Sequence, residues 1–102
     1  MNRGEVWLAD VGNKRRPVLV LTRSEVLDVR ALVTVAEITT TARGLAAEVP
    51  FDHAATGLDR PSVINCDGIH SIDQRRLATH VGELDADVMT RVCAAIHYAL
   101  GC

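Results

Sequence analysis

The pattern of apolar and polar positions along the chain predicts a series of short β-strands. Runs rich in Val, Ile, Leu and Thr alternate with residues typical of turns, and this arrangement indicates strands. The predicted strands are residues 5–10, 18–21, 32–41, 47–51, 62–66 and 80–84. Residues 18–21 are apolar throughout, as in a strand covered on both faces. The polar residues 12–16 before them predict a loop.

The last part of the chain has a helical pattern instead. Asp85 is a good N-cap and Gly101 ends the pattern. Apolar residues recur between them at helical spacing, at Val88, Met89, Val92, Cys93, Ile96, Ala99 and Leu100. They predict an amphipathic helix of about four turns. Short strands, tight turns and a terminal helix together favour a mainly β fold, a small, strongly bent antiparallel barrel with the helix packed against it.

The length and composition of the chain restrict its organisation. We expect one domain over residues 1–102, because single domains cluster near this size. The N-terminus lacks an apolar leader, and no apolar run approaches the roughly 18 residues that a membrane helix needs. We therefore expect neither export nor membrane insertion, and a cytoplasmic location. Three widely spaced cysteines match no zinc pattern and no disulfide framework, so no metal or cofactor is predicted.

The charge distribution bears on the partners of the chain. A formal net charge of −2 argues against a large basic face that grips duplex nucleic acid. The densest basic cluster is Lys14, Arg15 and Arg16. It is either a solvated loop or a contact for phosphate. With only three aromatic residues, base stacking on aromatic platforms is disfavoured.

Two motifs, in order, resemble the opening of the MazF/PemK family of toxins. Residues 3–10 read R-G-E-V-W-L-A-D, and residues 16–21 read R-P-V-L-V-L. The resemblance continues through V-A-E-I-T at 35–39, P-S-V-I-N-C-D at 61–67, I-H-S-I-D at 69–73, R-L at 76–77 and V-G-E-L at 81–84. It covers nearly the whole chain.

The resemblance implies a fold, an activity and partners. The fold is a small SH3-like (PemK/CcdB-like) antiparallel β-barrel with a C-terminal helix, acting as a homodimer. The activity is that of a sequence-specific, metal-independent endoribonuclease toxin of a type II toxin–antitoxin system. Such a toxin cleaves single-stranded RNA by transesterification, in which the 2′-hydroxyl of the RNA attacks the adjacent phosphorus. The products are a 2′,3′-cyclic phosphate and a 5′-hydroxyl. The partner is a MazE-like cognate antitoxin whose acidic, partly disordered tail occludes the RNA groove.

Two catalytic positions of the family carry over to this chain. The arginine of the R-P-V motif falls on Arg16, and the hydroxyl residue of the I-T motif falls on Thr39. A guanidinium presents a planar fork of donors to two phosphate oxygens, and a hydroxyl can donate to the third. Alone, Arg16 reads as an exposed cation ahead of a proline, and Thr39 as a strand-forming residue; the surrounding motifs favour the catalytic interpretation.

Three features depart from the family or extend its site. His70 stands where relatives often have arginine, and it either exchanges a proton or caps a turn. Period two places Glu37 beside Thr39, as a general base or, as we favour, as the salt-bridge partner of Arg16. The first loop is shorter than in many relatives. Residues assigned to RNA contact are Lys14, Arg15, Arg43, Thr40 and Thr41.

Two other functions fit a barrel of this kind. A CcdB-like gyrase poison shares the fold but depends on a C-terminal tail that contains tryptophan. This chain ends Ala99-Leu100-Gly101-Cys102, so that alternative ranks lower. A non-catalytic RNA-binding barrel is the second alternative.

Overall fold

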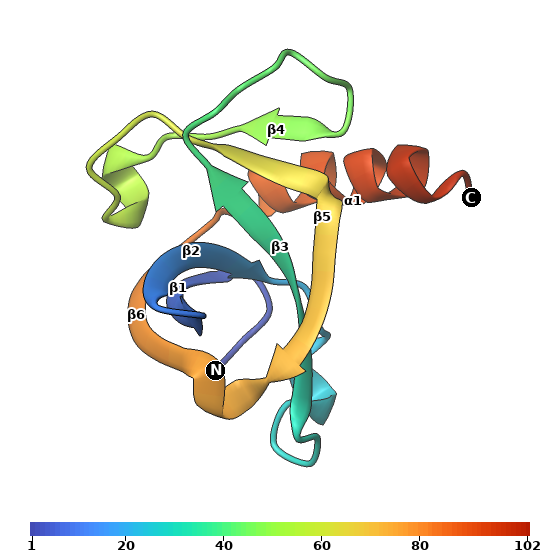
Figure 1. Cartoon of the computed structure of the whole chain (residues 1–102). Coiled ribbons are helices and arrows are strands. Elements are labelled where there is room, and N and C mark those ends of the chain that lie inside the picture. The colour runs from blue at the N-terminus through green and yellow to red at the C-terminus, as the bar shows by residue number, and fades with distance from the viewer.

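The computed structural model describes residues 1–102 and contains a curved antiparallel sheet and one long helix (Figure 1). The strands are β1 (Glu5–Val11), β2 (Lys14–Val20), β3 (Leu32–Thr39), β4 (Glu48–Pro50), β5 (Val63–Asp73) and β6 (Leu77–Glu83). The helix is α1 (Ala86–Leu100), and three short 3₁₀ turns are η1 (Ser24–Val26), η2 (Ala54–Thr56) and η3 (Gln74–Arg76). The prediction of a mainly β chain with a C-terminal helix is confirmed.

The six strands form one sheet that does not close into a barrel. Their order is β4-β5-β3-β2-β1-β6, and the edge strands β4 and β6 do not pair. The predicted barrel is therefore corrected to a strongly bent but open antiparallel sheet. The turn η2, not β4, lies against β6, with the residues around Thr56 close to the backbone of Val81 and Gly82. The helix α1 packs against β4 and β5.

The hairpin of β1 and β2 is tighter than the sequence pattern suggested. Val11 pairs with Lys14, so only Gly12 and Asn13 form the turn. Gly12 has φ 61°, a backbone conformation that glycine adopts without a steric penalty. The predicted loop over residues 12–16 is corrected accordingly: Lys14, Arg15 and Arg16 belong to β2.

Strand β5 is longer than predicted because it continues past a bulge. Ala36 of β3 pairs with Ile69, whereas the next residue, Glu37, pairs with Asn65. Residues 66–68 of β5 therefore have no partner on β3. Such a bulge bends a strand and changes the direction of its side chains. The polar stretch that we interpreted as the end of a strand is this bulge.

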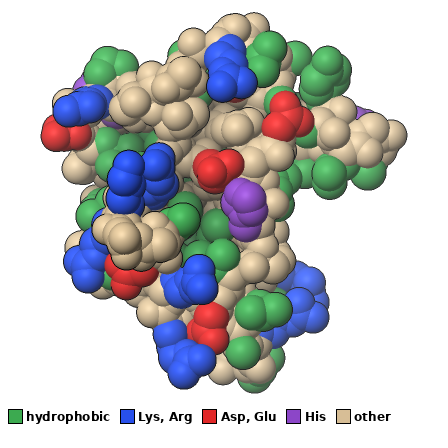
Figure 2. All heavy atoms as spheres, viewed as in Figure 1, with side chains coloured by type: hydrophobic (Ala, Val, Ile, Leu, Met, Phe, Trp, Pro, Cys, Tyr) green, Lys and Arg blue, Asp and Glu red, His purple; other side chains and the backbone are tan.

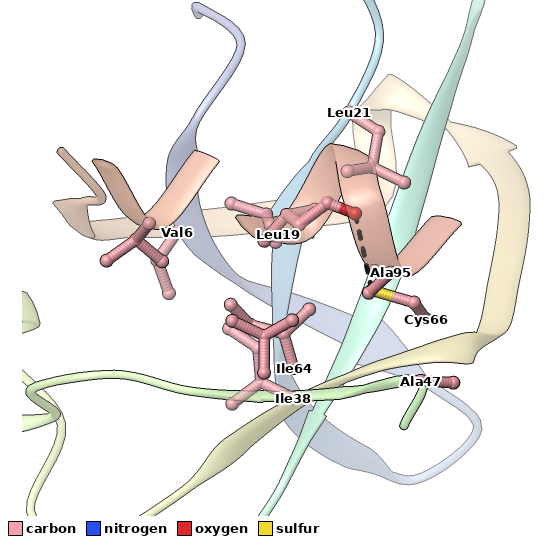
Figure 3. Close-up of a cluster of buried hydrophobic side chains, with 12 residues drawn as sticks. Val6, Leu19, Leu21, Ile38, Ala47, Ile64, Cys66 and Ala95 are labelled. Atoms are coloured by element: carbon pink, nitrogen blue, oxygen red, sulfur yellow. Dashed lines mark hydrogen bonds between the residues drawn. The ribbon is translucent and has the colours of Figure 1, made fainter. Parts of the chain in front are cut away.

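Apolar side chains fill both faces of the central strands. One cluster lies between the sheet and α1 and includes Leu19, Ile38, Ile64 and Val92 (Figure 3). A second cluster lies on the opposite face of the central strands and includes Val18, Val20, Val33, Val35 and Leu77. Alternate residues of β2 enter the two clusters, which confirms a strand covered on both faces.

The helix begins and ends where its capping residues predict. The carboxylate of Asp85 accepts a hydrogen bond from the Val88 N–H at 2.9 Å, and Gly101 takes the left-handed C-cap conformation with φ 72°. Val88, Val92 and Ala95 on its inner face are buried. The structure has no helix of the length and apolarity needed to cross a membrane.

We predict that Gly82→Ala destabilises the fold. A Cβ at residue 82 would lie 2.5 Å from the Thr56 carbonyl oxygen and 2.9 Å from its carbonyl carbon. Backbone must move to relieve such a contact, at a cost of about 1–3 kcal/mol. Denaturant unfolding measures this cost. Gly68→Ala is the matched control, since its Cβ meets the end of the half-exposed Glu37 side chain, and a change of about 0.5 kcal/mol or less is expected there. Equal stability of the two variants would contradict this account.

Candidate functional site

The candidate site is the polar continuation of the second apolar cluster. Val18 and Val20 on β2, and Val33 and Val35 on β3, belong to that cluster. Side chains of a strand alternate between faces, so the next positions along the same face are Arg16 on β2 and Glu37 and Thr39 on β3. The face of the sheet that is apolar and buried at Val18 and Val35 is therefore polar at Arg16, Glu37 and Thr39.

Strand register brings Arg16 towards Thr39. Val20 pairs with Val35 and Val18 pairs with Glu37. The pairing of β2 with β3 ends at Val18 and Glu37. The same register, continued by two residues, sets Arg16 opposite Thr39. Two residues that are far apart in the sequence therefore reach one edge of the same surface. The sequence motifs had predicted both as catalytic.

These residues line a groove with a volume of about 570 Å³. Acidic, basic and histidine side chains gather over the middle of this face of the molecule (Figure 2). The lining residues that bear on its chemistry are Arg16, Glu37, Thr39, Thr41, Arg43, Glu48, Asn65, Asp67, His70, Ser71 and Arg76. The predicted residues Arg16, Glu37, Thr39, His70, Thr41 and Arg43 are thus brought together.

The carboxylate of Glu37 pairs with His70 and not with Arg16. Oε2 of Glu37 lies 3.4 Å from Nε2 of His70, and both side chains are about half exposed, at 49% and 56%. His70 lies opposite Val35, so it is a diagonal neighbour of Glu37 on the same face of the sheet. The expected ion pair between Glu37 and Arg16 is absent, because the register places Glu37 beside β5 and opposite Val18.

The hydroxyl of Thr39 keeps its donor free. Its Oγ1 accepts a hydrogen bond from the backbone N–H of Thr41 at 3.1 Å. A hydroxyl has one O–H and two acceptor lone pairs, so this bond uses only a lone pair. The Thr39 O–H therefore remains available to a ligand in the groove, and the contact holds the oxygen in place.

One wall of the groove is held by the carboxylate of Glu48. It accepts hydrogen bonds from the backbone N–H of Arg43, at 2.9 and 3.2 Å to its two oxygens, and from that of Leu45 at 3.1 Å. The N–H groups of Leu45 and Arg43 lower the pKa of the Glu48 carboxyl below its usual value. Because Arg43 has no strand partner, these bonds fix where its side chain leaves the backbone.

Three residues predicted to contact RNA lie outside the groove. Lys14, Arg15 and Thr40 are not among its lining residues. Arg15 forms an ion pair with Asp10, with 2.9 Å between Nε and Oδ1, across the β1–β2 hairpin. Arg15 and Arg16 are successive residues of a strand and therefore point to opposite faces, which separates their roles.

The structure adds lining residues that sequence reasoning missed. Asn65 lines the groove and pairs with Glu37 of β3 on one side and with Glu48 of β4 on the other. Its Oδ1 accepts from the Asp67 N–H at 3.1 Å, so its amide N–H groups are left to other partners. Arg76, in η3, also lines the groove. Both belong to segments that resemble the family, but only the tertiary fold shows that they face the site.

The groups in the groove suit phosphodiester chemistry. Arg16 and Thr39 can donate hydrogen bonds to phosphate oxygens, and His70 and Glu37 can exchange protons. Positioned donors and an acid–base pair are what cleavage of a phosphodiester requires. A small, mainly β chain with such a groove has the side chains that a nuclease needs.

Comparison with known proteins identifies the family. The family model described as "PemK-like, MazF-like toxin of type II toxin-antitoxin system" matches residues 2–100. The chain is 48% identical to endoribonuclease MazF3 of Mycobacterium tuberculosis over 84 residues, which cover 82% of this chain and 81% of that protein. This chain belongs to the PemK/MazF family of toxins, as its sequence motifs predicted.

Two solved structures have the same fold. The Mycobacterium tuberculosis toxin MazF-mt6 is 42% identical, with a TM-score of 0.89 over 95% of this chain and 96% of that one. An endoribonuclease in complex with its cognate antitoxin from a mycobacterial species is 26% identical, with a TM-score of 0.88 over 99% and 95% of the two chains. The observed strands and helix are therefore those of the family.

We predict that Glu48→Gln destabilises the chain at neutral pH and less so in acid. The folded-state pKa of Glu48 is depressed, so the stability that its ionised form contributes is present above the unfolded value of about 4.3 and is lost as the pH falls through the lower folded value. Denaturant unfolding of parent and variant at pH 7 and pH 3 measures the difference. Glu25→Gln, at an exposed residue outside the groove, is the control. A difference that grows on acidification would contradict the assignment.

Proposed function

We propose that this chain is the endoribonuclease toxin of a type II toxin–antitoxin system and that it cleaves single-stranded RNA in the groove between β2, β3 and β5. The observation that carries the proposal is the convergence of Arg16 and Thr39 on one groove, in a chain whose residues 2–100 match the family. Relatives that are named endoribonucleases support the activity.

Arg16 and Thr39 stabilise the transition state of a transesterification. The 2′-hydroxyl of the RNA attacks the adjacent phosphorus, its oxygen forms the new P–O bond, and the bond to the 5′-oxygen breaks. Negative charge grows on the non-bridging oxygens, where a guanidinium fork and a hydroxyl donor stabilise it. The products are a 2′,3′-cyclic phosphate and a 5′-hydroxyl. RNA supplies its own nucleophile, so the step needs no metal ion.

His70, with Glu37 beside it, transfers the protons of this reaction. The 2′-hydroxyl must lose a proton and the 5′-oxygen must gain one. The imidazole of His70 is suited to both transfers, and its contact with Glu37 at 3.4 Å supports a shared role. In this assignment Glu37 acts on His70, not on the guanidinium of Arg16.

The remaining predicted residues guide the RNA strand. Thr41 and Arg43 act within the groove, where Arg43 is held by Glu48. Lys14 and Arg15, on the β1–β2 hairpin, and Thr40, beside Thr41, contact phosphates beyond it. Such contacts hold a strand in place, so their loss raises KM more than it lowers kcat.

The proposed partners are a cognate antitoxin and a second copy of the chain in the cytoplasm. A structural relative has been solved in complex with its cognate antitoxin, which supports a MazE-like partner here. A groove that holds Arg16, Arg43 and Arg76 suits an acidic segment of such a partner. The homodimer rests on the family resemblance and on exposed apolar side chains such as Tyr98 and Leu100.

A gyrase poison and a non-catalytic RNA-binding protein are less well supported. Neither explains why an arginine, a threonine hydroxyl and a histidine paired with a carboxylate line the same groove. The named relatives are endoribonucleases, not gyrase inhibitors.

We predict that Arg16→Ala abolishes detectable cleavage and leaves the fold intact. Arg16 is exposed at the groove and makes no ion pair, so its loss costs the core little. Removal of one positioned donor typically lowers the rate about 10²–10³-fold, or roughly 3–4 kcal/mol. Single-turnover cleavage of RNA with circular dichroism of the variant tests this. Arg30→Ala, exposed and outside the groove, is the control, and an Arg16→Ala enzyme with parental turnover would remove Arg16 from the mechanism.

We also predict that cleavage persists in excess EDTA and requires the 2′-hydroxyl next to the cut. An oligonucleotide with a single 2′-deoxy substitution there should resist, while its all-RNA parent is cut to a 2′,3′-cyclic phosphate. End-group analysis by mass spectrometry identifies the product. Loss of activity on chelation, or cutting of the substituted strand, would replace this mechanism with a metal-assisted one.

A further inference from the structure

The bulge of β5 leaves a space at Gly68 that no other residue would leave. A Cβ built at residue 68 would lie 2.0 Å from Oε2 and 3.0 Å from Cδ of Glu37, and 3.1 Å from Nδ2 of Asn65. Real Cβ atoms do not approach other atoms within 3.0 Å, so any side chain would displace the carboxylate. The backbone does not require glycine there, because Gly68 is not among the glycines with positive φ. Glycine is therefore needed at residue 68 to leave room for the Glu37 carboxylate, and not for its backbone conformation.

The space at Gly68 is filled by the carboxylate that meets His70. Oε2 of Glu37, the atom that a Cβ would strike, is also the atom that lies 3.4 Å from Nε2 of His70. Residues 66–68 lie outside the pairing with β3, so Gly68 can sit beside Glu37 without a partner of its own. The bulge, the glycine and the contact between Glu37 and His70 thus form one local arrangement.

We propose that Glu37 and Gly68 are positioning residues for His70 in RNA cleavage, Glu37 by contacting the imidazole and Gly68 by leaving room for that contact. This inference rests on the function proposed above. It gives the glycine of the bulge a role in the reaction, and it makes the carboxylate and the imidazole one functional unit.

The contact determines which ring nitrogen of His70 takes part in proton transfer. The carboxylate of Glu37 approaches the ring at Nε2, so this contact occupies Nε2 and leaves Nδ1, the other ring nitrogen, to a ligand. Nδ1 is then the acceptor for the proton of the 2′-hydroxyl as its oxygen bonds to phosphorus. The proton that leaves Nδ1 next goes to the 5′-oxygen as the P–O bond breaks. Without the carboxylate the ring is free to turn, and Nδ1 loses its fixed orientation.

The test compares kcat and KM of three single variants, Gly68→Ala, Glu37→Gln and His70→Gln, on one RNA oligonucleotide. Two double variants, in which Gly68→Ala or Glu37→Gln is combined with His70→Gln, are measured on the same substrate. We expect His70→Gln to lower kcat about 10²–10⁴-fold, as for loss of an acid–base group. Gly68→Ala and Glu37→Gln should each lower kcat about 10–100-fold with little change in KM, as for partners that orient a reacting group. Neither should lower it further when His70 is already replaced.

Several results would overturn the proposal. One is a kcat equal to that of the parent in both Gly68→Ala and Glu37→Gln. Another is that these substitutions lower kcat by the same factor whether His70 is present or replaced, which would indicate a merely structural role. Gly68→Ala is expected to fold, and Glu37→Gln, which adds no atom, tests the same contact independently. Glu25→Gln, exposed and outside the groove, should keep parental activity. If His70→Gln cleaves normally while Arg16→Ala does not, this inference fails and the proposed function stands; if the parent cleaves no RNA, the proposed function fails first.

Discussion

The antiparallel register of β2, β3 and β5 is the constraint on which both the core and the groove depend. In this register Val18 lies opposite Glu37 and Val20 lies opposite Val35, and the three valines are buried in the second apolar cluster. Two residues further along, the same register sets Arg16 opposite Thr39 in the groove. Because strand side chains alternate with period two, a slip of one residue would exchange these side chains with those of the face packed on α1. The charged residues of the site would then face an apolar core, so hydrophobic burial enforces the geometry of the groove.

The bulge in β5 relaxes that constraint at one place. Residues 66–68 take no partner on β3, yet Cys66 stays buried in the core beneath α1, where burial raises the pKa of its thiol to about 11. One end of the bulge is therefore anchored by packing in the core, while the other, at Gly68, lies against the side chain of Glu37. Strand pairing resumes at Ile69, and His70 returns to the same face as Glu37. An irregularity of this kind next to a site redirects side chains without disturbing the sheet.

Local charge, not net charge, governs the groove. The chain carries a formal net charge of −2, yet three arginines line the same groove: Arg16 of β2, Arg43 of the segment between β3 and β4, and Arg76 of η3. Three carboxylates line it as well, and two of them are already engaged: Glu37 contacts His70, and Glu48 binds the backbone at Arg43 and Leu45. Asp67 forms no ion pair within the protein. The charges of Glu37 and Glu48 are thus partly satisfied, which leaves the arginines as the groups that attract an incoming phosphate.

The sequence by itself determined those features that depend on neighbours within a few residues, and only the tertiary structure decided the rest. Capping by Asp85 and Gly101 predicted the helix, and alternation predicted that Glu37 and Thr39 share a face. Motifs singled out Arg16 and Thr39, which the structure places in one groove. The sequence did not predict four other features: the open edge of the sheet, the position of Arg15 outside the groove, the contact of Glu37 with His70 and the role of Gly68. Periodicity reports which way a side chain points along its own strand, but contacts between residues some 30 positions apart depend on register and on a bulge whose residues look like the end of a strand.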